Sequence, residues 1–363
     1  MIHRRTPIVG LALLIGVALI LATPRLVTAA DSLPDRLSDA AFWRLSEQLS
    51  EPNGSFRSDN LLSNELYYPE IMADLMTRVP SGRVYLGVGP EQNFNYIVAL
   101  KPKMVFITDV RRGNLHLQLV YKALFELSKD RAEFVSRLFT KPRPAGLTEQ
   151  STIAQIVQAF WDVASGDAAT FEKNLQSVKD QLTKAHGMPL SKEDLDGIDY
   201  VYRSFYWYGP SINYNSSNNG GSGRSSMTTY AQLMVATDDA GKPWSYLATE
   251  DAFRTLKDLE ARNLLVPVVG NFGGARALKA VGQYVREHEA IVGAFYLSNV
   301  EQYLQQDGLW GTFCANVASM PLDESSAFIR SRSGGGGTFQ NQLGAMRAET
   351  LGCATPAAPG EVR

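Results

Sequence analysis

The stretch Val84-Tyr85-Leu86-Gly87-Val88-Gly89-Pro90-Glu91-Gln92 decides the fold class. It opens with β-branched and aromatic residues, a composition typical of a short buried strand, and its glycines end that strand. An apolar-periodic segment runs on through Leu100, and a second strand-like run follows at Met104–Thr108. Strand, helix and strand at this spacing predict a β-α-β unit, from which parallel sheets are built.

Working outward, the same alternation returns later in the chain. Helical periodicity covers residues 116–127, and two more buried-type strands are expected at residues 264–269 and 291–297, each preceded by a helical stretch at 249–261 or 275–288. Because strands that alternate with helices wind helices onto both faces of one sheet, we predict an α/β fold. The sheet is expected to be open, mostly parallel and doubly wound, with helical insertions.

The remaining segments differ from this core in composition. Residues 213–226 are rich in Asn, Gly and Ser, so they can bury little and are predicted to form a flexible loop. The full division is an N-terminal leader at 1–30, a lead-in at 31–82, an α/β domain at 83–332 with a helical insertion at about 151–208, and a flexible tail at 333–363.

The first thirty residues are typical of a targeting segment. His3, Arg4 and Arg5 precede an apolar run, and small residues follow at Val27–Ala30. This pattern predicts a secretory signal peptide, or an uncleaved N-terminal membrane anchor. Either alternative places the remaining chain in the bacterial periplasm or cell envelope, and a cytoplasmic protein with a misread N-terminus is the remaining alternative.

Composition narrows the classes of ligand. The chain has 35 Lys plus Arg against 37 Asp plus Glu, and loss of residues 1–30 removes three Arg, which takes the formal net charge from −2 to −5. A mildly acidic body gives no reason to expect nucleic acid. Four His and two Cys in no metal-binding spacing indicate that no metal site is expected.

Two positions beyond the predicted strand ends suit a ligand. Ligands of open parallel sheets bind outside the carboxyl ends of the strands. Gly87 and Gly89 let a backbone approach a ligand closely, and Glu91 and Asn93 lie at the helix start that follows. Asp109 ends the second strand, 20 residues after Gly89, where a carboxylate can accept both hydroxyls of a ribose.

On these residues, the stretch from Val84 to Asn114 resembles the first β-α-β unit of class I S-adenosylmethionine-dependent methyltransferases. The whole chain after the leader also resembles a bacterial family of unassigned activity with a methyltransferase-like, Rossmann-like core. The resemblance implies S-adenosylmethionine as the cofactor, with Gly87 and Gly89 in the nucleoside-binding loop and Asp109 as the ribose acid. Two departures stand out, because the third glycine of the loop is replaced near Glu91 and no Asn-Pro-Pro-Tyr tetrad occurs.

Other polar residues near strand ends are candidates for the same site. Arg111 is expected at the cofactor and Arg112 at the substrate, where each guanidinium either clamps an anion or pairs with a neighbouring acid such as Asp109 or Glu91. Substrate candidates also include Asn271, Asn299 and Glu301, and the pair Asn64-Glu65 is expected to complete a polar rim. His116 is either a base or an inert surface residue.

Cys314 and Cys353 are the only cysteines. In an oxidising compartment they form a disulfide or remain two separate thiols, and the sequence leaves both alternatives open.

Function is where two expectations conflict. An exported methyltransferase has no evident supply of S-adenosylmethionine, which is charged and does not cross hydrocarbon unaided. We therefore keep two hypotheses, an exported methyltransferase-like protein with a nucleoside-type ligand cleft, and a non-catalytic envelope protein that retains the fold to bind a small ligand or another protein.

Overall fold

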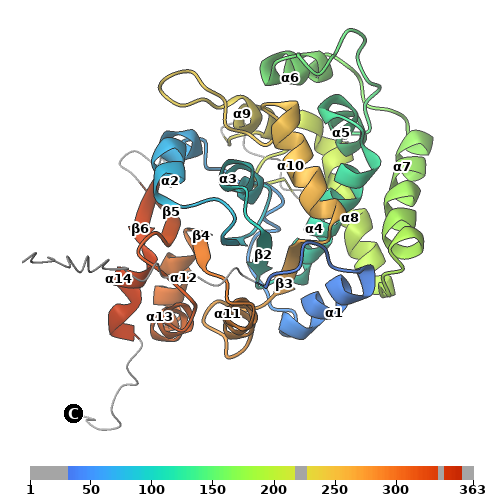
Figure 1. Cartoon of the computed structure of the whole chain (residues 1–363). Helices are drawn as coiled ribbons and strands as arrows, with labels where there is room; N and C mark the ends of the chain where they lie inside the picture. The colour runs from blue at the N-terminus through green and yellow to red at the C-terminus, as the bar shows by residue number, and fades with distance from the viewer. Residues whose placement is uncertain (1–31, 217–226, 334–338, 354–363) are drawn as a thin grey trace, which may run out of the picture. The chain divides into compact units, whose positions relative to one another are not determined.

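The structure, a computed structural model, describes residues 32–216, 227–333 and 339–353. Figure 1 shows its helices and strands. The predicted leader, most of the predicted loop 213–226 and the last residues of the predicted tail lie outside the described residues. Within the described ranges, no helix has both the length and the apolar composition that crossing a membrane requires.

One six-stranded sheet organises residues 32–353, in the order β3-β2-β1-β4-β5-β6. Its strands are β1 (Val84–Val88), β2 (Met104–Asp109), β3 (Leu265–Val269), β4 (Val292–Ser298), β5 (Ala327–Ser333) and β6 (Phe339–Ala345). The first five are parallel and β6 is antiparallel to β5. The predicted open, mostly parallel α/β sheet is confirmed, and its order is compatible with a Rossmann-like fold.

The four predicted strands form because each is a continuous apolar run. All five residues of β1 and all six of β2 are buried, as expected for strands covered on both faces. The chain leaves β1 toward β2 and β3, then returns to the other side of β1 as β4. The order therefore reverses between β1 and β4, which is where ligands bind in open α/β sheets.

Helices cover both faces of this sheet (Figure 1). One face is covered by α1 (Asp39–Leu49), α11 (Ala277–Glu287) and α13 (Trp310–Ala318), and the other by α2 (Met72–Arg78), α3 (Gln92–Leu100), α4 (Arg112–Leu127) and α10 (Glu250–Ala261). Two short helices complete this core, α12 (Val300–Gln306) after β4 and α14 (Met346–Thr350) after β6.

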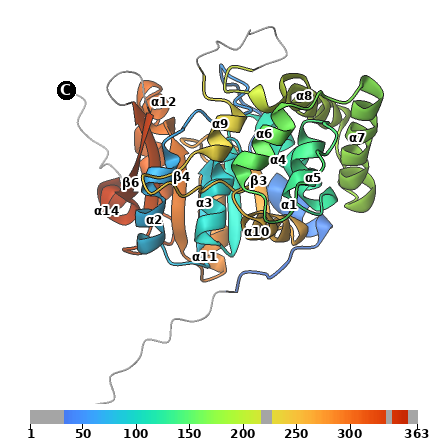
Figure 2. The same cartoon turned by 90° about the horizontal axis from the view of Figure 1, so that it is seen from above.

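Between β2 and β3 the chain forms a series of helices, which begins before the predicted insertion at about 151–208 and continues beyond it. The series contains α5 (Arg131–Leu138), α6 (Ile153–Trp161), α7 (Ala168–Asp180), one π-helical turn (Gln181–Ala185), α8 (Lys192–Tyr208) and α9 (Tyr230–Val235). Its apolar stripe packs inward, since Phe160, Phe171 and Leu182 are buried. Figures 1 and 2 both show α7 and α8 far from β6 and α14.

The prediction of a flexible tail at 333–363 is wrong for residues 339–353. Phe339–Ala345 form the antiparallel edge strand β6, paired with β5 over the whole length of both strands. Arg330 of β5 is buried and forms ion pairs with Glu301 of α12 at 2.8 Å and with Glu349 of α14 at 2.7 Å. The second ion pair holds the helix that follows β6 against the sheet. Backbone pairing and these ion pairs order the segment despite its polar sequence.

Residues 31–82, predicted as a lead-in, pack against the sheet and its helices. Helix α1 packs on β3 and α11, and Ser46 Oγ donates a hydrogen bond of 2.6 Å to the Pro267 carbonyl. After α1 the chain crosses the carboxyl ends of the strands before it enters a 3-10 turn (Tyr68–Ile71) and α2. This N-terminal region is therefore part of the domain.

Candidate functional site

A cavity of about 750 Å³ lies at the carboxyl ends of the strands. It is lined from β1 and β4, between which the strand order reverses, by Val88, Tyr296 and Ser298. The segment before β1, the ends of β2 and β3, helix α12 and the strands β5 and β6 supply the other walls. Its place and its size match those of small-molecule sites in α/β proteins.

One wall of the cavity comes from residues 50–65, here called the strap. Backbone hydrogen bonds hold it to the sheet, from Glu51 N to the Val269 carbonyl at 2.7 Å and from Gly54 N to the Val110 carbonyl at 2.8 Å. Its side chains line the cavity from Ser55 to Glu65. The sequence predicted only Asn64 and Glu65 of this wall, because the bonds that hold the strap against the sheet join backbone groups of segments far apart in sequence.

The strap also caps two helix starts. The Glu51 carboxylate accepts the backbone N–H groups of Arg276 and Ala277 at 2.8 and 2.9 Å, where α11 begins. Asn53 Oδ1 accepts the N–H of Arg112 at 2.7 Å, where α4 begins. Helix N-termini bind anions through such free N–H groups, and these two are already occupied by the chain's own acceptors.

The glycine loop is braced from inside by Asn93. Its Nδ2 donates to the carbonyls of Val88 at 2.9 Å and Pro90 at 2.7 Å, and Tyr85 donates to its Oδ1 at 3.1 Å. A Cβ on Gly87 would lie 1.7 Å from Asn93 Oδ1, so residue 87 must be glycine for this brace to fit. Gly89 has a φ of 72°, the left-handed conformation that favours glycine.

The residues that this loop contributes to the cavity wall differ from the predicted ones. Gly87, Gly89 and Asn93 do not line the cavity, and the loop contributes Val88 and Pro90 instead. Glu91 is fully buried away from the cavity and accepts the N–H of Ser63 at 3.3 Å, while its burial raises its pKa to about 8. These residues shape the loop and fill the start of α3.

Asp109 is the predicted site residue that reaches the cavity from β2. Its Oδ1 accepts the N–H of Arg111 at 2.9 Å, and the Arg111 guanidinium lies 3.4 Å from the same oxygen. Burial raises the pKa of Asp109, and the charge of Arg111 opposes that rise. Arg111 itself does not line the cavity, since its Nη1 donates to the Asp59 carbonyl of the strap at 2.5 Å.

Arg112 and His116 are held away from the cavity by one acid. Asp194 of α8 accepts from Arg112 Nε at 2.6 Å and lies 2.8 Å from His116 Nε2. Burial lowers the pKa of His116, and the bond to Asp194 opposes that effect. This cluster joins α4 to α8, and neither Arg112 nor His116 lines the cavity.

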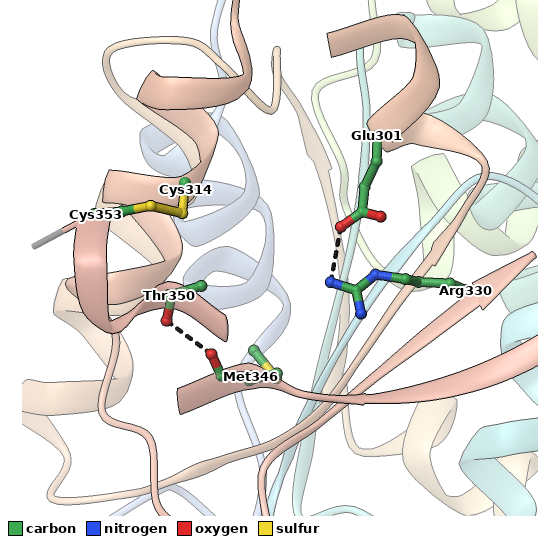
Figure 3. Close-up of a disulfide and its surroundings, with 6 residues drawn as sticks. All are labelled: Glu301, Cys314, Arg330, Met346, Thr350 and Cys353. Carbon is green, nitrogen blue, oxygen red and sulfur yellow. Dashed lines mark hydrogen bonds and ion pairs between the residues drawn. A yellow bond between two sulfur atoms is a disulfide. The ribbon is translucent and has the colours of Figure 1, made fainter. Parts of the chain in front are cut away.

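Of the remaining substrate candidates, two line the cavity and one does not. Asn271, after β3, and Asn299, after β4, both line it. Glu301 does not, because its carboxylate points to Arg330, as Figure 3 shows.

A polar cluster forms the cavity wall beside β4 and β5. Glu65 of the strap, 1% exposed, accepts from Tyr296 Oη at 2.8 Å, Ser298 Oγ at 2.5 Å and Asn341 Nδ2 at 2.7 Å. Burial raises the pKa of Glu65, and these hydrogen bonds oppose the rise. Ser298 has a φ of 50°, unusual for a residue with a side chain, at a bulge in the pairing of β4 with β5.

The cavity also has an aromatic wall between the strap and α12. The rings of Phe56 and Tyr303 meet edge to face with centroids 5.2 Å apart. Arg57 donates from Nη2 to Tyr303 Oη at 2.7 Å, and its guanidinium lies 5.3 Å from the ring centroid. Phe272, Phe339 and Tyr214 line the cavity elsewhere. Such rings bind flat organic groups through their faces and edges.

Away from the cavity, Cys314 and Cys353 form a disulfide with Cα atoms 5.6 Å apart. Figure 3 shows that it joins α13 to the short 3-10 turn (Leu351–Cys353) after α14. This is one of the two alternatives that the sequence left open. Among the residues that the structure describes, no group of three or more His, Cys, Asp and Glu side chains is arranged to hold a metal ion.

Comparison with known proteins identifies the family of this chain. No curated protein matches the sequence. A family model described as a domain of unknown function (DUF7790) matches residues 61–348, which include all six strands, Glu65 and Asp109. The chain belongs to this DUF7790 family.

Proposed function

We propose that the cavity binds a nucleoside-type small molecule of the S-adenosylmethionine class, with Asp109 accepting the ribose hydroxyls. One observation carries the proposal: the Asp109 carboxylate and the loop residues Val88 and Pro90 line the same cavity, beside the point where the strand order reverses. An acid at the end of the second strand is the group that holds a ribose in Rossmann-like folds.

The occupied helix starts favour a nucleoside without phosphates. A dinucleotide places its diphosphate on a free helix N-terminus. Here the Asn53 amide oxygen occupies the start of α4 and the Glu51 carboxylate occupies the start of α11, while Glu91 and Gln92 at the start of α3 are fully buried. A phosphate would meet an amide oxygen at the start of α4 and a carboxylate at the start of α11, whereas a nucleoside needs only the hydroxyl acceptor and a wall for its base.

The residues present fit such a ligand in three respects. Asp109 supplies the hydroxyl acceptor, Phe56 and Tyr303 supply an aromatic wall, and a volume of about 750 Å³ holds a molecule of this size. S-adenosylmethionine would supply an activated methyl group when bound. Transfer of that group depends mainly on positioning and exclusion of water, so it requires no strong nucleophile from the protein.

The alternative is a binding protein without methyl transfer. Its support is the sequence at the end of β4. There the cavity wall carries Ser298 and Asn299, and the Asn-Pro-Pro-Tyr tetrad is absent. Asn271 also lines the cavity, but it follows β3, at the edge of the parallel strands. We propose the same ligand class for this alternative, with the protein exported to the periplasm or cell envelope by its N-terminal segment. A reporter fused to the C-terminus, assayed on each side of the inner membrane, tests that location.

Calorimetry tests the proposed function. Titration of the purified protein with S-adenosylmethionine and with S-adenosylhomocysteine should give saturable heat for at least one of them. Saturable heat followed by a methylated product in whole-cell extract supports the methyltransferase, and saturable heat with no product supports the binding protein. No heat for either compound at millimolar concentration contradicts the proposed ligand class.

A further inference from the structure

The cavity has an unbalanced charge that bears on its ligand. Three acidic side chains line it, Glu65, Asp109 and Asp307, against one basic side chain among the described residues, Arg57. Asp109 has the guanidinium of Arg111 at 3.4 Å, and Asp307 is exposed to water. Glu65 differs from Asp307 because it is buried, and it differs from Asp109 because no guanidinium of the described residues lies beside it.

Glu65 has hydrogen-bond donors but no cation. Its donors are two hydroxyl groups and one side-chain amide, and no Lys, Arg or His among the described residues forms an ion pair with it. Removing a carboxylate from water without a counter-charge is costly, so an ionised Glu65 gains when a positive group enters the cavity beside it.

Residues from separate strands hold Glu65 in place. Ser298 keeps a left-handed conformation at the end of β4, which residues with a side chain rarely adopt, and its hydroxyl donates to Glu65. Asn341, whose amide donates to the other carboxylate oxygen, comes from the antiparallel edge strand β6. Three separate segments, the strap, β4 and β6, therefore meet around one carboxylate at the cavity wall.

We propose that Glu65 receives a positively charged amine of the ligand, so the cavity selects nucleosides that carry an ammonium group over neutral ones. The proposal rests on the proposed function, since it assigns the second half of the same ligand. Asp109 takes the ribose hydroxyls, and Glu65 takes an ammonium at the other end of the molecule. Glu65 thereby determines specificity and takes no part in bond making.

Two thioether nucleosides that differ only in the ammonium group test the effect of the ligand's positive charge. S-adenosyl-3-thiopropylamine ends in an ammonium group, and 5′-butylthio-5′-deoxyadenosine has a methyl group in its place with nearly the same shape. We expect the unaltered protein to bind the amine at least about tenfold more tightly than the butyl compound at neutral pH, which corresponds to about 1.4 kcal/mol. Equal affinities for the two compounds overturn the proposal without any variant.

The variant Glu65→Gln tests whether Glu65 causes the preference for the amine over the butyl compound. Its amide keeps the shape of the carboxylate and removes the charge, so the amine's advantage should fall to about twofold or less while the butyl compound binds as before. The matched control is Asp307→Asn, which removes one exposed charge from the same cavity and should keep most of the preference. An equal fall in both variants would mean that the general negative charge selects the amine, and this would overturn the role of Glu65.

The two failures are distinguishable. If neither compound binds the unaltered protein, the proposed nucleoside ligand is wrong. If both bind equally, the nucleoside site stands and the ammonium subsite is wrong. Because both results come from the unaltered protein, a folding defect in Glu65→Gln does not obscure them.

Discussion

Asn93 occupies the space that a side chain at residue 87 would need, since a Cβ there would lie 1.7 Å from Asn93 Oδ1. Gly87→Ala should therefore displace Asn93 and weaken its bonds to the Val88 and Pro90 carbonyls. We expect a loss of about 1–3 kcal/mol in the free energy of unfolding, measured by urea denaturation. The control is Gly113→Ala in α4, where no atom lies within 4 Å and alanine should stabilise by up to about 1 kcal/mol. Equal stability of both variants would show that Asn93 does not brace the loop.

The second prediction concerns Glu51 of the strap, which caps the start of α11. Its carboxylate accepts three backbone N–H groups, from Asn271, Arg276 and Ala277. Glu51→Gln removes the charge and one acceptor at the start of α11, so it should destabilise the protein by about 1–2 kcal/mol in thermal or urea unfolding. Glu287→Gln, in the last turn of the same helix, removes an exposed charge from the unfavourable end and should not destabilise. A Glu51→Gln variant as stable as the unaltered protein would contradict the capping role.

The disulfide should contribute measurably to stability. It closes a loop between residues 39 apart, and its loss in the double variant Cys314→Ser with Cys353→Ser is expected to cost about 2–4 kcal/mol. A reductant should lower the melting temperature of the unaltered protein toward that of the double variant and leave the double variant unchanged. A melting temperature that does not respond to reductant would contradict a bond that supports the fold.

His186 makes stability depend on pH with a predictable sign. Its Nε2 lies 2.6 Å from Glu126 Oε2 and its Nδ1 lies 2.6 Å from Asp39 Oδ1. The bond to Glu126 raises the pKa of His186, although burial and Lys122 oppose this. Because the pKa of His186 is higher in the folded protein than in the unfolded chain, protonation of His186 stabilises the folded protein at pH values below the unfolded pKa of about 6.5. This stabilisation is lost as the pH rises through the pKa of the folded state.

His186→Asn should therefore destabilise more at about pH 5.5 than at about pH 9. His116→Asn provides the opposite sign, because burial lowers the pKa of His116 and the folded state then resists protonation. Its cost should be smaller at the acidic pH. Urea denaturation of both variants at the two pH values measures this, and a His186→Asn cost that is equal at both would contradict the ion-pair account.

The central strands could be predicted because apolar runs alone determine them. Val84–Val88 is a strand with the predicted bounds, and β2 begins at Met104 and ends at Asp109, as predicted. The strands β5 and β6 could not be predicted in this way. β5 contains Arg330, which is buried only because Glu301 and Glu349 pair with it, and these partners are distant in sequence.

The cavity residues that lie at strand ends were predicted from the sequence. Those that depend on how loops pack were not. Asp109, Asn271 and Asn299 line the cavity because the carboxyl ends of parallel strands meet at one edge of the sheet. The glycine loop has the predicted place, yet its polar groups bond to one another, which no spacing reveals. The strap was missed because its bonds to β3 and to the end of β2 join backbone atoms of segments far apart in sequence.

The most direct test of the nucleoside site compares two ligands on two proteins. S-adenosylhomocysteine and its analogue without the 2′ and 3′ hydroxyls would be titrated into the unaltered protein and into Asp109→Asn by calorimetry. We expect loss of the hydroxyls to weaken binding to the unaltered protein by about tenfold or more, because hydrogen bonds to a buried carboxylate are lost, and to change little in Asp109→Asn. An equal loss in both proteins, or none in either, would contradict the assignment of Asp109 to the ribose.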